Sequence, residues 1–264
     1  MRRRLDTELV RRGLVPSRAR AVEAIGAGLV TVGGAPATTP ARQVAPDEPV
    51  AVAGTPARFV SRGGEKLDAA LSYWSIDVAG RRVLDAGAST GGVTDCVLQR
   101  GAAAVVAVDV GHGQLAWTIR SDPRVEVIER TNLRNLEALP GGPADCAVAD
   151  LSFISLITVA PALARLTTID AQLVLLVKPQ FEAGRARVGR GGVIRERAVH
   201  RDVLGEVVAG LAMNDLVVVD VIRSPLKGAE GNVEFLASVF KAGHASAVVG
   251  ADRLDAVTDE EETP

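Results

Sequence analysis

Four ionisable side chains interrupt apolar stretches of this sequence at points where they could do chemistry. Asp150 and Lys178 each end an apolar, β-branched run, and Pro179 stops the second of these runs. Lys66 follows a glycine-containing loop at the start of a predicted helix, and Glu234 lies in a predicted late strand. A lysine among carboxylates can accept a proton if it is neutral, or stabilise developing negative charge if it is protonated. A charge at a strand end is also commonly just a surface residue, so these positions alone leave both interpretations open.

A glycine-rich turn, DAGASTGG, covers residues 85–92 and predicts a binding site for a nucleotide-like ligand. Such a turn at the start of a helix exposes backbone N–H groups and lets a ligand approach closely. A dinucleotide site would read GxGxxG, whereas here Asp85 precedes the first glycine and Ser89 replaces the second. Asp85 would repel a pyrophosphate but suits a cationic ligand, and Asp109, 24 residues further on, can accept hydrogen bonds from a ribose diol. The two acids favour S-adenosylmethionine over NAD, and an ordinary tight turn is the alternative.

Alternating strand-like and helical segments from residue 82 onward predict the elements that position these side chains. Strands are expected at residues 83–85, 104–108, 125–128, 146–149 and 173–177, with a helix from the glycine-rich turn to about residue 100. This pattern predicts an α/β, Rossmann-like domain with a mostly parallel sheet and helices on both faces. Ligands of such sheets bind at the carboxyl ends of the strands, so Asp150 and Lys178 would face the same crevice as the cofactor.

The length of 264 residues, with 47% hydrophobic and 23% charged residues, is typical of one large or two ordinary globular domains. Cys96 and Cys146 are too few for a disulfide framework or a four-cysteine zinc site and are expected in the core. His112, His200 and His244 have no metal-ligand spacing, so we expect no metal. No apolar stretch follows the N-terminal arginines, and none elsewhere is long enough for a membrane span. These features favour a cytoplasmic protein.

Charge is unevenly distributed along the chain. Residues 1–60 carry a net charge of +4, from nine arginines and five acids, whereas residues 61–264 carry −6. Apolar spacing predicts two short helices near the N-terminus, the second capped by Ser17, followed by strands near residues 29–32 and 50–52. The arginines on or beside these helices are Arg2, Arg3, Arg4, Arg11, Arg12, Arg18 and Arg20. A small basic module on an acidic body predicts capture of a polyanion, against the alternative that the arginines only solubilise the surface.

The run from Arg4 to Gly34, with its RLD, RG and SR motifs and the spaced pattern I..G.V.V.G, resembles the S4 RNA-binding domain. This resemblance implies a small α+β module that binds structured RNA through backbone phosphates. The residues it implies for RNA binding are Arg3, Arg4, Arg11, Arg12, Arg18 and Arg20.

Further motifs extend a resemblance over nearly the whole chain. DAGASTGG, DVGHGQLAW, ERTN, ADLSFISL, VKPQFE and GNVEF together resemble the TlyA family of ribosomal RNA methyltransferases, which is also labelled haemolysin A. The catalytic fold of that family is similar to that of the FtsJ-type RNA 2′-O-methyltransferases. The resemblance implies 2′-O-methylation of cytidine in ribosomal RNA of one or both subunits, with S-adenosylmethionine as cofactor. The oligomeric state stays open, and we expect a monomer on the RNA. One departure is the segment Arg58–Ser61, where the family often has an arginine and a tryptophan before SRG.

The same resemblance assigns residues to sites. The catalytic set it implies is Lys66, Asp150, Lys178 and Glu234. The cofactor site it implies is Asp85, Gly87, Ser89, Gly91, Asp109, Thr131 and Asn132. The domains expected are an S4-like domain at 1–57, a linker at 58–61, an FtsJ-like methyltransferase domain at 62–250 and a flexible acidic tail at 251–264.

Methyl transfer to a ribose hydroxyl is an in-line displacement on a sulfonium, so a catalyst must orient the 2′-oxygen and relieve it of its proton. Lys178 is the residue expected at this hydroxyl. A neighbouring cation, Lys66, would favour its neutral form, whereas Asp150 and Glu234 would favour its charged form, so its protonation state stays open.

Three alternatives remain at this point. Methylation of a base amino group typically involves an Asn-Pro-Pro-Tyr-like motif, but the matching segment here is Asp150-Leu151-Ser152-Phe153. A membrane-active haemolysin is suggested by the second family label, although no membrane span is predicted. An RNA-binding ribosome-assembly factor without catalysis is disfavoured by the complete set of candidate catalytic residues.

Overall fold

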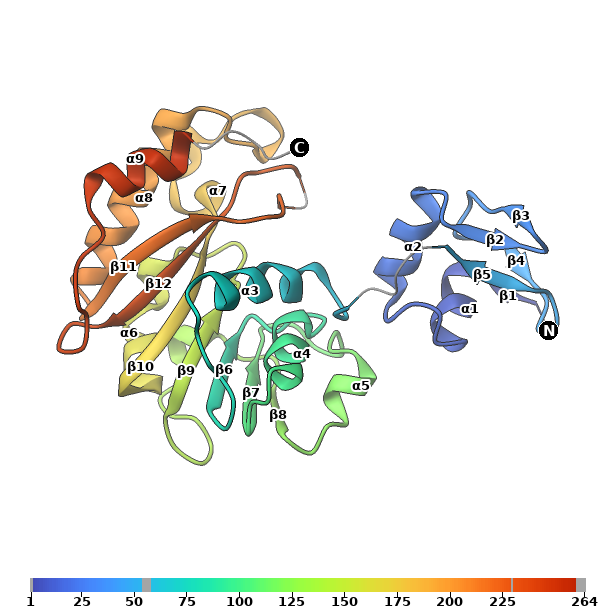
Figure 1. Cartoon of the computed structure of the whole chain (residues 1–264), viewed down its shortest axis with the longest axis horizontal. Helices are drawn as coiled ribbons and strands as arrows, with labels where there is room; N and C mark the ends of the chain where they lie inside the picture. The colour runs from blue at the N-terminus through green and yellow to red at the C-terminus, as the bar shows by residue number, and fades with distance from the viewer. Residues whose placement is uncertain (1, 54–57, 229, 260–264) are drawn as a thin grey trace.

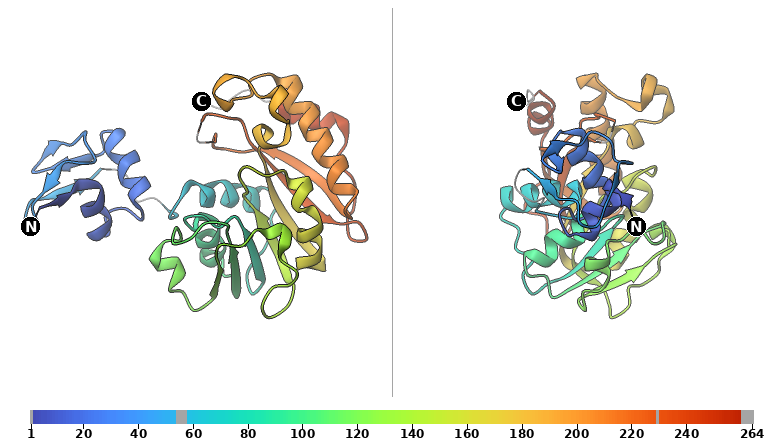
Figure 2. Two further views of the ribbon diagram at one scale, coloured as in Figure 1. Left: turned by 180° about the vertical axis from the view of Figure 1, so that it is seen from behind. Right: turned by 90° about the vertical axis from the view of Figure 1, so that its right-hand side faces the viewer.

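The computed structural model describes residues 2–53, 58–228 and 230–259, which form a small N-terminal unit and a larger α/β domain (Figure 1). The N-terminal unit lies outside the large sheet, beyond the start of the first helix of the α/β domain (Figure 2). Each part has its own apolar core.

The N-terminal unit packs two short helices against small strands. Its elements are β1 (Arg3–Arg4), α1 (Leu5–Arg11), α2 (Arg18–Gly26), β2 (Val30–Val32), β3 (Ala35–Pro36), β4 (Gln43–Val44) and β5 (Val50–Val52). The side chain of Ser17 caps α2 by accepting a hydrogen bond from the backbone N–H of Arg20, as predicted. Leu5, Leu9 and Ile25 from the two helices are fully buried, which confirms the predicted apolar spacing.

A seven-stranded sheet forms the centre of the described part of the α/β domain. Its strands are β6 (Arg82–Ala86), β7 (Ala104–Val108), β8 (Val125–Ile128), β9 (Ala144–Ala149), β10 (Thr167–Val177), β11 (Leu216–Arg223) and β12 (Phe235–Lys241). They are arranged in the order β11-β12-β10-β9-β6-β7-β8. The strand β12 is antiparallel to both of its neighbours, β10 and β11, while the other pairings are parallel. The beginning of β12 therefore lies at the carboxyl edge of the parallel strands, where Phe235 pairs with Val177.

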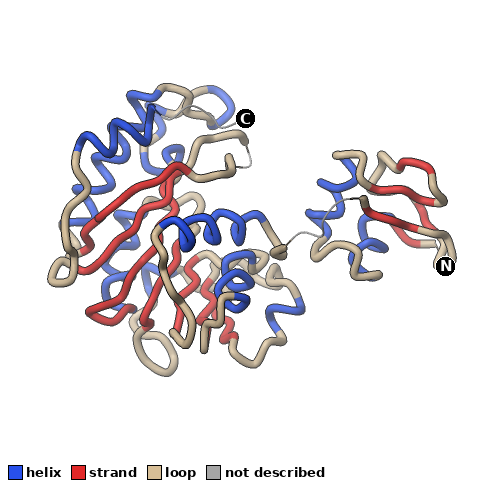
Figure 3. Tube along the Cα trace, viewed as in Figure 1, coloured by secondary structure: helices blue, strands red, loops and turns tan. Residues whose placement is uncertain are grey.

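Helices cover both faces of this sheet (Figure 3). The helices are α3 (Arg62–Tyr73), α4 (Gly92–Gln99), α5 (Trp117–Arg120), α6 (Leu156–Leu166), α7 (Pro179–Glu182), α8 (Arg197–Ala212) and α9 (Ala251–Asp259). One apolar cluster joins one face of the sheet to α3, α4 and α5, and a second joins the other face to α6, α8 and α9. The predicted α/β architecture is confirmed. Cys96 and Cys146 are completely buried, and burial raises the pKa of each thiol to about 12, so both are core residues.

Two segments differ from the sequence predictions. Phe59 and Val60, which we expected in a linker, are buried against α3 and α4 because both side chains are apolar. The acidic segment expected to be a flexible tail forms the helix α9 over residues 251–259. Leu254 and Val257, three positions apart on one helix face, pack against α8 and β11. The tail prediction is wrong for these residues, and its remainder, 260–264, lies outside the described residues.

Candidate active site

Two adjoining cavities open at the carboxyl edge of the sheet. The first, which we name the turn cavity, has a volume of about 540 Å³ and begins at the glycine-rich turn. The second, the lysine cavity, has a volume of about 570 Å³ and contains the candidate catalytic residues. Asp150, Ser152 and Phe153 line both cavities, so the loop after β9 is the wall at which the two meet.

The lysine cavity brings the four predicted catalytic residues together as two ion pairs. The Lys178 ammonium lies 2.6 Å from an oxygen of Asp150 and 3.1 Å from the hydroxyl of Ser152. The Lys66 ammonium donates to a Glu234 oxygen at 2.5 Å. Both lysines and Glu234 are buried, which strengthens electrostatic interactions between them. Of the four lysines in the sequence, Lys66, Lys178 and Lys227 line this cavity.

Topology explains how distant residues meet here. Asp150 follows β9 and Lys178 follows β10, and these adjacent parallel strands end at the same edge. Glu234 immediately precedes β12 rather than lying inside it, contrary to the prediction. Because β12 is antiparallel, its first residues reach the edge at which β10 ends. Lys66 completes the group from the second turn of α3, the helix that packs against one face of the sheet.

The turn cavity contains most of the predicted cofactor residues. Those that line it are Gly87, Ser89, Asp109, Thr131 and Asn132. The Asp109 carboxylate, which follows β7, accepts hydrogen bonds from the backbone N–H of Ser89 at 2.8 Å and of Gly111 at 2.6 Å. Each carboxylate oxygen has a second lone pair, so Asp109 retains the capacity to accept from a diol.

Gly87 makes the contact between the turn and the catalytic loop possible. It has a φ of +91°, and a Cβ at this position would lie 2.5 Å from the carbonyl oxygen of Asp150. Only glycine adopts this conformation readily and leaves room for that approach. The absence of a side chain at Gly87 therefore lets the glycine-rich turn lie against the loop after β9, where the two cavities meet.

Asp85 and Gly91, also predicted to bind the cofactor, do not line the turn cavity. Asp85 is fully buried below the turn and accepts a hydrogen bond from the Thr94 hydroxyl at 2.5 Å. Its other carboxylate oxygen has no hydrogen-bond partner among the described residues, and burial raises its pKa to about 7. A cationic ligand above the turn would stabilise the ionised form of this acid. Gly91 forms the start of α4, and a Cβ there would clash with Leu115.

The observed features fit S-adenosylmethionine as the ligand of the turn cavity. The volume lies within the range of about 300–1,000 Å³ that is usual for small-molecule sites. Asp109 provides a ribose acceptor, and the buried, unpaired oxygen of Asp85 would carry negative charge when a cationic ligand stabilises the ionised form of this acid. Both features favour a ligand that is cationic and carries a ribose.

Phe153 is a candidate functional residue that sequence reasoning did not identify. The chain has few aromatic residues, yet this one is 90% exposed. It lines both cavities. The Phe181 ring lies 4.9 Å away, centroid to centroid. Glu182 holds the same loop by accepting hydrogen bonds from the Ser155 hydroxyl at 2.5 Å and the Leu156 N–H at 2.8 Å. The signal in the sequence was an isolated aromatic residue three positions after the strand-end acid Asp150.

Four arginines of the N-terminal unit are held by two buried acids. Asp6 accepts hydrogen bonds from Arg4 and Arg18, and these contacts hold the pKa of Asp6 well below its usual range. Glu8 accepts from Arg11 and Arg12, which lowers its pKa to about 2.

The predicted RNA-binding arginines differ in their accessibility. Arg3, Arg4, Arg11 and Arg18 are exposed or half-exposed. Arg12 is only 19% exposed and donates to the carbonyls of Ala45, Pro46 and Glu48, so it fastens a loop. The Arg20 side chain is 17% exposed and pairs with Glu23 and with Glu65 of the α/β domain. The structure thus separates arginines that face solvent from two that make internal contacts.

Comparison with known proteins places these observations in a family. Residues 59–241 match the FtsJ-like methyltransferases, and residues 3–50 match the S4 domain. The chain is 53% identical over 237 residues to the 16S/23S rRNA (cytidine-2′-O)-methyltransferase TlyA of Mycobacterium tuberculosis, across 89% of this chain and 88% of that relative. This chain belongs to the TlyA family of FtsJ-like methyltransferases.

Two further similar proteins agree with this assignment. A putative rRNA methyltransferase of Bacillus subtilis, YqxC, is 44% identical over 88% of this chain and 84% of its own length. The solved structure of a putative hemolysin from Streptococcus thermophilus superposes with a TM-score of 0.79 at 38% identity, covering 97% of this chain and 94% of that one. The family and the fold predicted from the sequence motifs are therefore confirmed. The domain limits predicted from the sequence remain predictions.

Proposed function

We propose that this protein transfers a methyl group from S-adenosylmethionine to the 2′-hydroxyl of a cytidine in ribosomal RNA. The observation that carries this proposal is the junction of the two cavities, where Asp150 lines both cavities and forms an ion pair with Lys178, which lines the lysine cavity. A ribose placed in the lysine cavity would present its hydroxyl to that junction. The names of the relatives from Mycobacterium tuberculosis and Bacillus subtilis support ribosomal RNA as the substrate.

The turn cavity would hold the cofactor through the residues that line it. Asp109 would accept hydrogen bonds from the ribose diol, and Ser89, Thr131 and Asn132 would contact the remaining polar groups. Asp85 would act from below the turn through its charge. When bound, S-adenosylmethionine supplies an electrophilic methyl group on a sulfonium.

Lys178 would act on the 2′-oxygen. Its ammonium is fixed by Asp150 and Ser152, so its position is defined before substrate binds. If neutral, it takes the proton of the hydroxyl; if protonated, it orients the oxygen and stabilises the negative charge that develops there. The Lys66–Glu234 pair forms the opposite part of the cavity and balances charge around the substrate.

RNA recognition would be divided between the two parts of the chain. Arg4, Arg11 and Arg18 of the N-terminal unit would contact backbone phosphates. The exposed ring of Phe153 offers a surface on which an unstacked base can stack next to the cavity junction. Such a protein would act in the cytoplasm as a monomer on the ribosomal subunit.

A methyl-transfer assay on isolated ribosomal subunits tests the proposal. Radiolabelled S-adenosylmethionine should label ribosomal RNA, and alkaline hydrolysis should leave one resistant dinucleotide, because a 2′-O-methyl group blocks cleavage of the adjacent phosphodiester. Label on a base without alkali resistance would indicate base methylation. RNA binding without label would indicate an assembly factor.

The second family label is tested separately. No helix within the described ranges is long and apolar enough to cross a membrane. Release of dye from lipid vesicles by the full chain, with no label in ribosomal RNA, would favour membrane activity over methyl transfer.

A further inference from the structure

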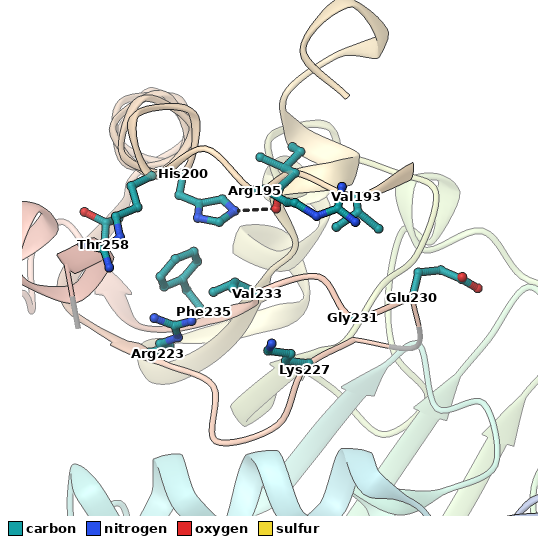
Figure 4. A pocket seen from close by; sticks show the side chains of 12 residues that line it. Val193, Arg195, His200, Arg223, Lys227, Glu230, Gly231, Val233, Phe235 and Thr258 are labelled. Atoms are coloured by element: carbon teal, nitrogen blue, oxygen red, sulfur yellow. Dashed lines mark hydrogen bonds between the residues drawn. The ribbon is translucent and has the colours of Figure 1, made fainter. Parts of the chain in front are cut away.

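A third cavity, which we name the arginine cavity, lies next to the active site and has no role in the proposed transfer step. Its volume is about 680 Å³. Its walls come from the segment before α8, from the start of α8, from the loop between β11 and β12, and from the end of α9 (Figure 4). Arg195, Arg197, Arg223 and Lys227 line it, together with a single carboxylate in the lining, Glu230, among the described residues.

The positive charge of this cavity contrasts with the rest of the domain. Residues 61–264 carry a net charge of −6, yet the charged residues that line the arginine cavity are four cations and one carboxylate. One of these cations, Arg197, lies 3.8 Å from the Asp259 carboxylate at the end of α9. Burial lowers the pKa of His200, and its ring nitrogen Nε2 lies 3.2 Å from the carbonyl oxygen of Ile194. Arg195 makes no ion pair with any other described residue, and its side chain is exposed. The cavity is therefore suited to an anion.

The segment Val233–Phe235 separates the arginine cavity from the catalytic group. Val233 and Phe235 line the arginine cavity, whereas Glu234 between them lines the lysine cavity. This division follows from the alternation of side chains along an extended chain. Lys227 and Glu230 line both cavities, so the two lie side by side.

The loop that joins the cavities is held firmly at this position. Asn232 is buried, its side-chain oxygen accepts from the Ile194 N–H at 3.0 Å, and its amide donates to the Gly192 carbonyl at 2.9 Å. The guanidinium of Arg62 donates to the Lys227 carbonyl. The path between the cavities therefore has walls fixed by hydrogen bonds.

We infer that the arginine cavity binds a backbone phosphate of the RNA strand next to the target nucleotide. This inference rests on the proposed function, because it identifies the anion from the position of the arginine cavity beside the site of methyl transfer. A nucleotide in the lysine cavity is followed by a phosphodiester, and the shared wall at Lys227 leads that strand toward Arg195 and Arg223. Guanidinium groups match the geometry of phosphate oxygens by donating two hydrogen bonds at once. An acidic peptide is the other class of polyanion, and nothing in the active site calls for one.

The test uses the full chain with Arg195→Gln and Arg223→Gln combined, and measures its affinity for a ribosomal RNA fragment over a range of salt concentrations. The matched control is Arg124→Gln with Arg165→Gln, which removes the same charge before β8 and at the end of α6, near the amino edge of the sheet. Loss of two phosphate contacts should reduce the log–log salt slope by about 1.4 for single-stranded RNA. That change corresponds to about a 25-fold weaker affinity at 0.1 M salt, if both proteins bind equally at 1 M. The control should keep the wild-type slope.

Several outcomes decide the inference. An unchanged salt slope for RNA binding by the Arg195/Arg223 variant overturns the inference. It is also overturned if the wild type binds a polyglutamate peptide and the variant loses that binding while its RNA binding stays intact. Thermal unfolding checks that the double variant is folded. If the double change unfolds the protein, the single change Arg195→Gln at an exposed position should still lower the log–log salt slope by about 0.7. RNA binding is measured here without methyl transfer. If the wild type binds RNA but transfers no methyl group, the proposed function is refuted, while the salt-slope test of the arginine cavity can still be carried out.

Discussion

The N-terminal unit and the catalytic domain both hold cations beside carboxylates, but with opposite exposure. In the N-terminal unit the acids Asp6 and Glu8 are buried, while Arg4 and Arg18 extend from them toward solvent. In the lysine cavity both members of the Lys66–Glu234 pair are buried. The first arrangement aims fixed cations outward, and the second encloses them.

This difference corresponds to two tasks. Exposed guanidinium groups on buried anchors are ordered before they meet a ligand, so they lose little conformational entropy on contact with phosphates. We propose that the enclosed ammonium groups act on one oxygen atom of the substrate, where their fixed positions stabilise a developing negative charge. Binding and chemistry are thus separated in the chain, and changes in one part should leave the other measurable.

The largest effect is expected for Lys178→Ala. Methyl transfer should fall by about 10²–10⁴-fold in a single turnover with both ligands saturating, because one positioned proton acceptor or charge stabiliser is lost. Binding of S-adenosylmethionine and of RNA should remain. Lys241→Ala is the control, since that lysine donates to the Thr167 carbonyl, away from the cavities. Near wild-type turnover by the Lys178 variant would refute the mechanism.

The second effect concerns the N-terminal unit. A chain that begins at Arg58 keeps Phe59 and Val60 in the catalytic core but lacks the exposed arginines. If Arg4, Arg11 and Arg18 each contact a phosphate, RNA affinity should fall by about 100-fold at 0.1 M salt, and the log–log slope by about 2. Calorimetric titration with S-adenosylmethionine should give the affinity of the full chain. Full-rate methylation of subunits by the shortened chain would show that the N-terminal unit is not the RNA anchor.

A smaller effect is expected for Asp109→Ala. Loss of hydrogen bonds from a ribose diol to a charged acceptor should weaken binding of S-adenosylmethionine by about 10- to 100-fold. RNA affinity should stay the same. Asp122→Ala, which removes a carboxylate paired with Arg124 near the start of β8, serves as the control in the same titration. Equal cofactor affinity of wild type and the Asp109 variant would contradict the assignment.

The smallest effect is a dependence of stability on pH that has opposite signs in the two regions. The folded pKa of Asp85 is about 7, above its unfolded value, so its contribution to stability falls as pH rises from about 4 to 7. The pKa of Glu8 is lowered to about 2, so its contribution is present above about pH 4.5 and is lost as pH falls below that.

Urea denaturation at pH 5 and pH 7.5 measures the Asp85 component. Wild type should lose stability relative to Asp85→Asn at the higher pH, because the amide does not ionise. Asp122→Asn should follow the wild type. A constant difference between wild type and the Asp85 variant at both pH values would show that the buried acid does not titrate in this range.

The sequence predicted what depends on local pattern. Strand ends at Asp150 and Lys178 were recognisable because β-branched runs stop there, and the two strands proved to be neighbours. The placement of Glu234 inside a strand was wrong, since the reversed direction of β12 is a property of the whole sheet. The membership of Lys66 and Glu234 in one site followed only from a family resemblance, because no local pattern connects them, and their ion pair was not predicted.

Burial was harder to predict than position. Asp85 lies at the expected strand end, but its side chain points below the turn and away from the cavity wall. Leu254 and Val257 were overlooked among acidic neighbours, although two apolar residues on one face were enough to dock α9. Accessibility of Arg12 and Arg20 depends on partners far along the chain, which composition does not reveal.

The 168 positions between Lys66 and Glu234 affect the order in which the protein becomes competent during translation. The N-terminal unit is complete after about the first fifth of the chain, whereas β12 is synthesised near the end and then enters the sheet between β10 and β11. Until that insertion, Lys66 has no carboxylate partner and the cavity has no wall on that side. A nascent chain that has not yet reached β12 therefore already carries the exposed arginines of the N-terminal unit but lacks the complete group of candidate catalytic residues.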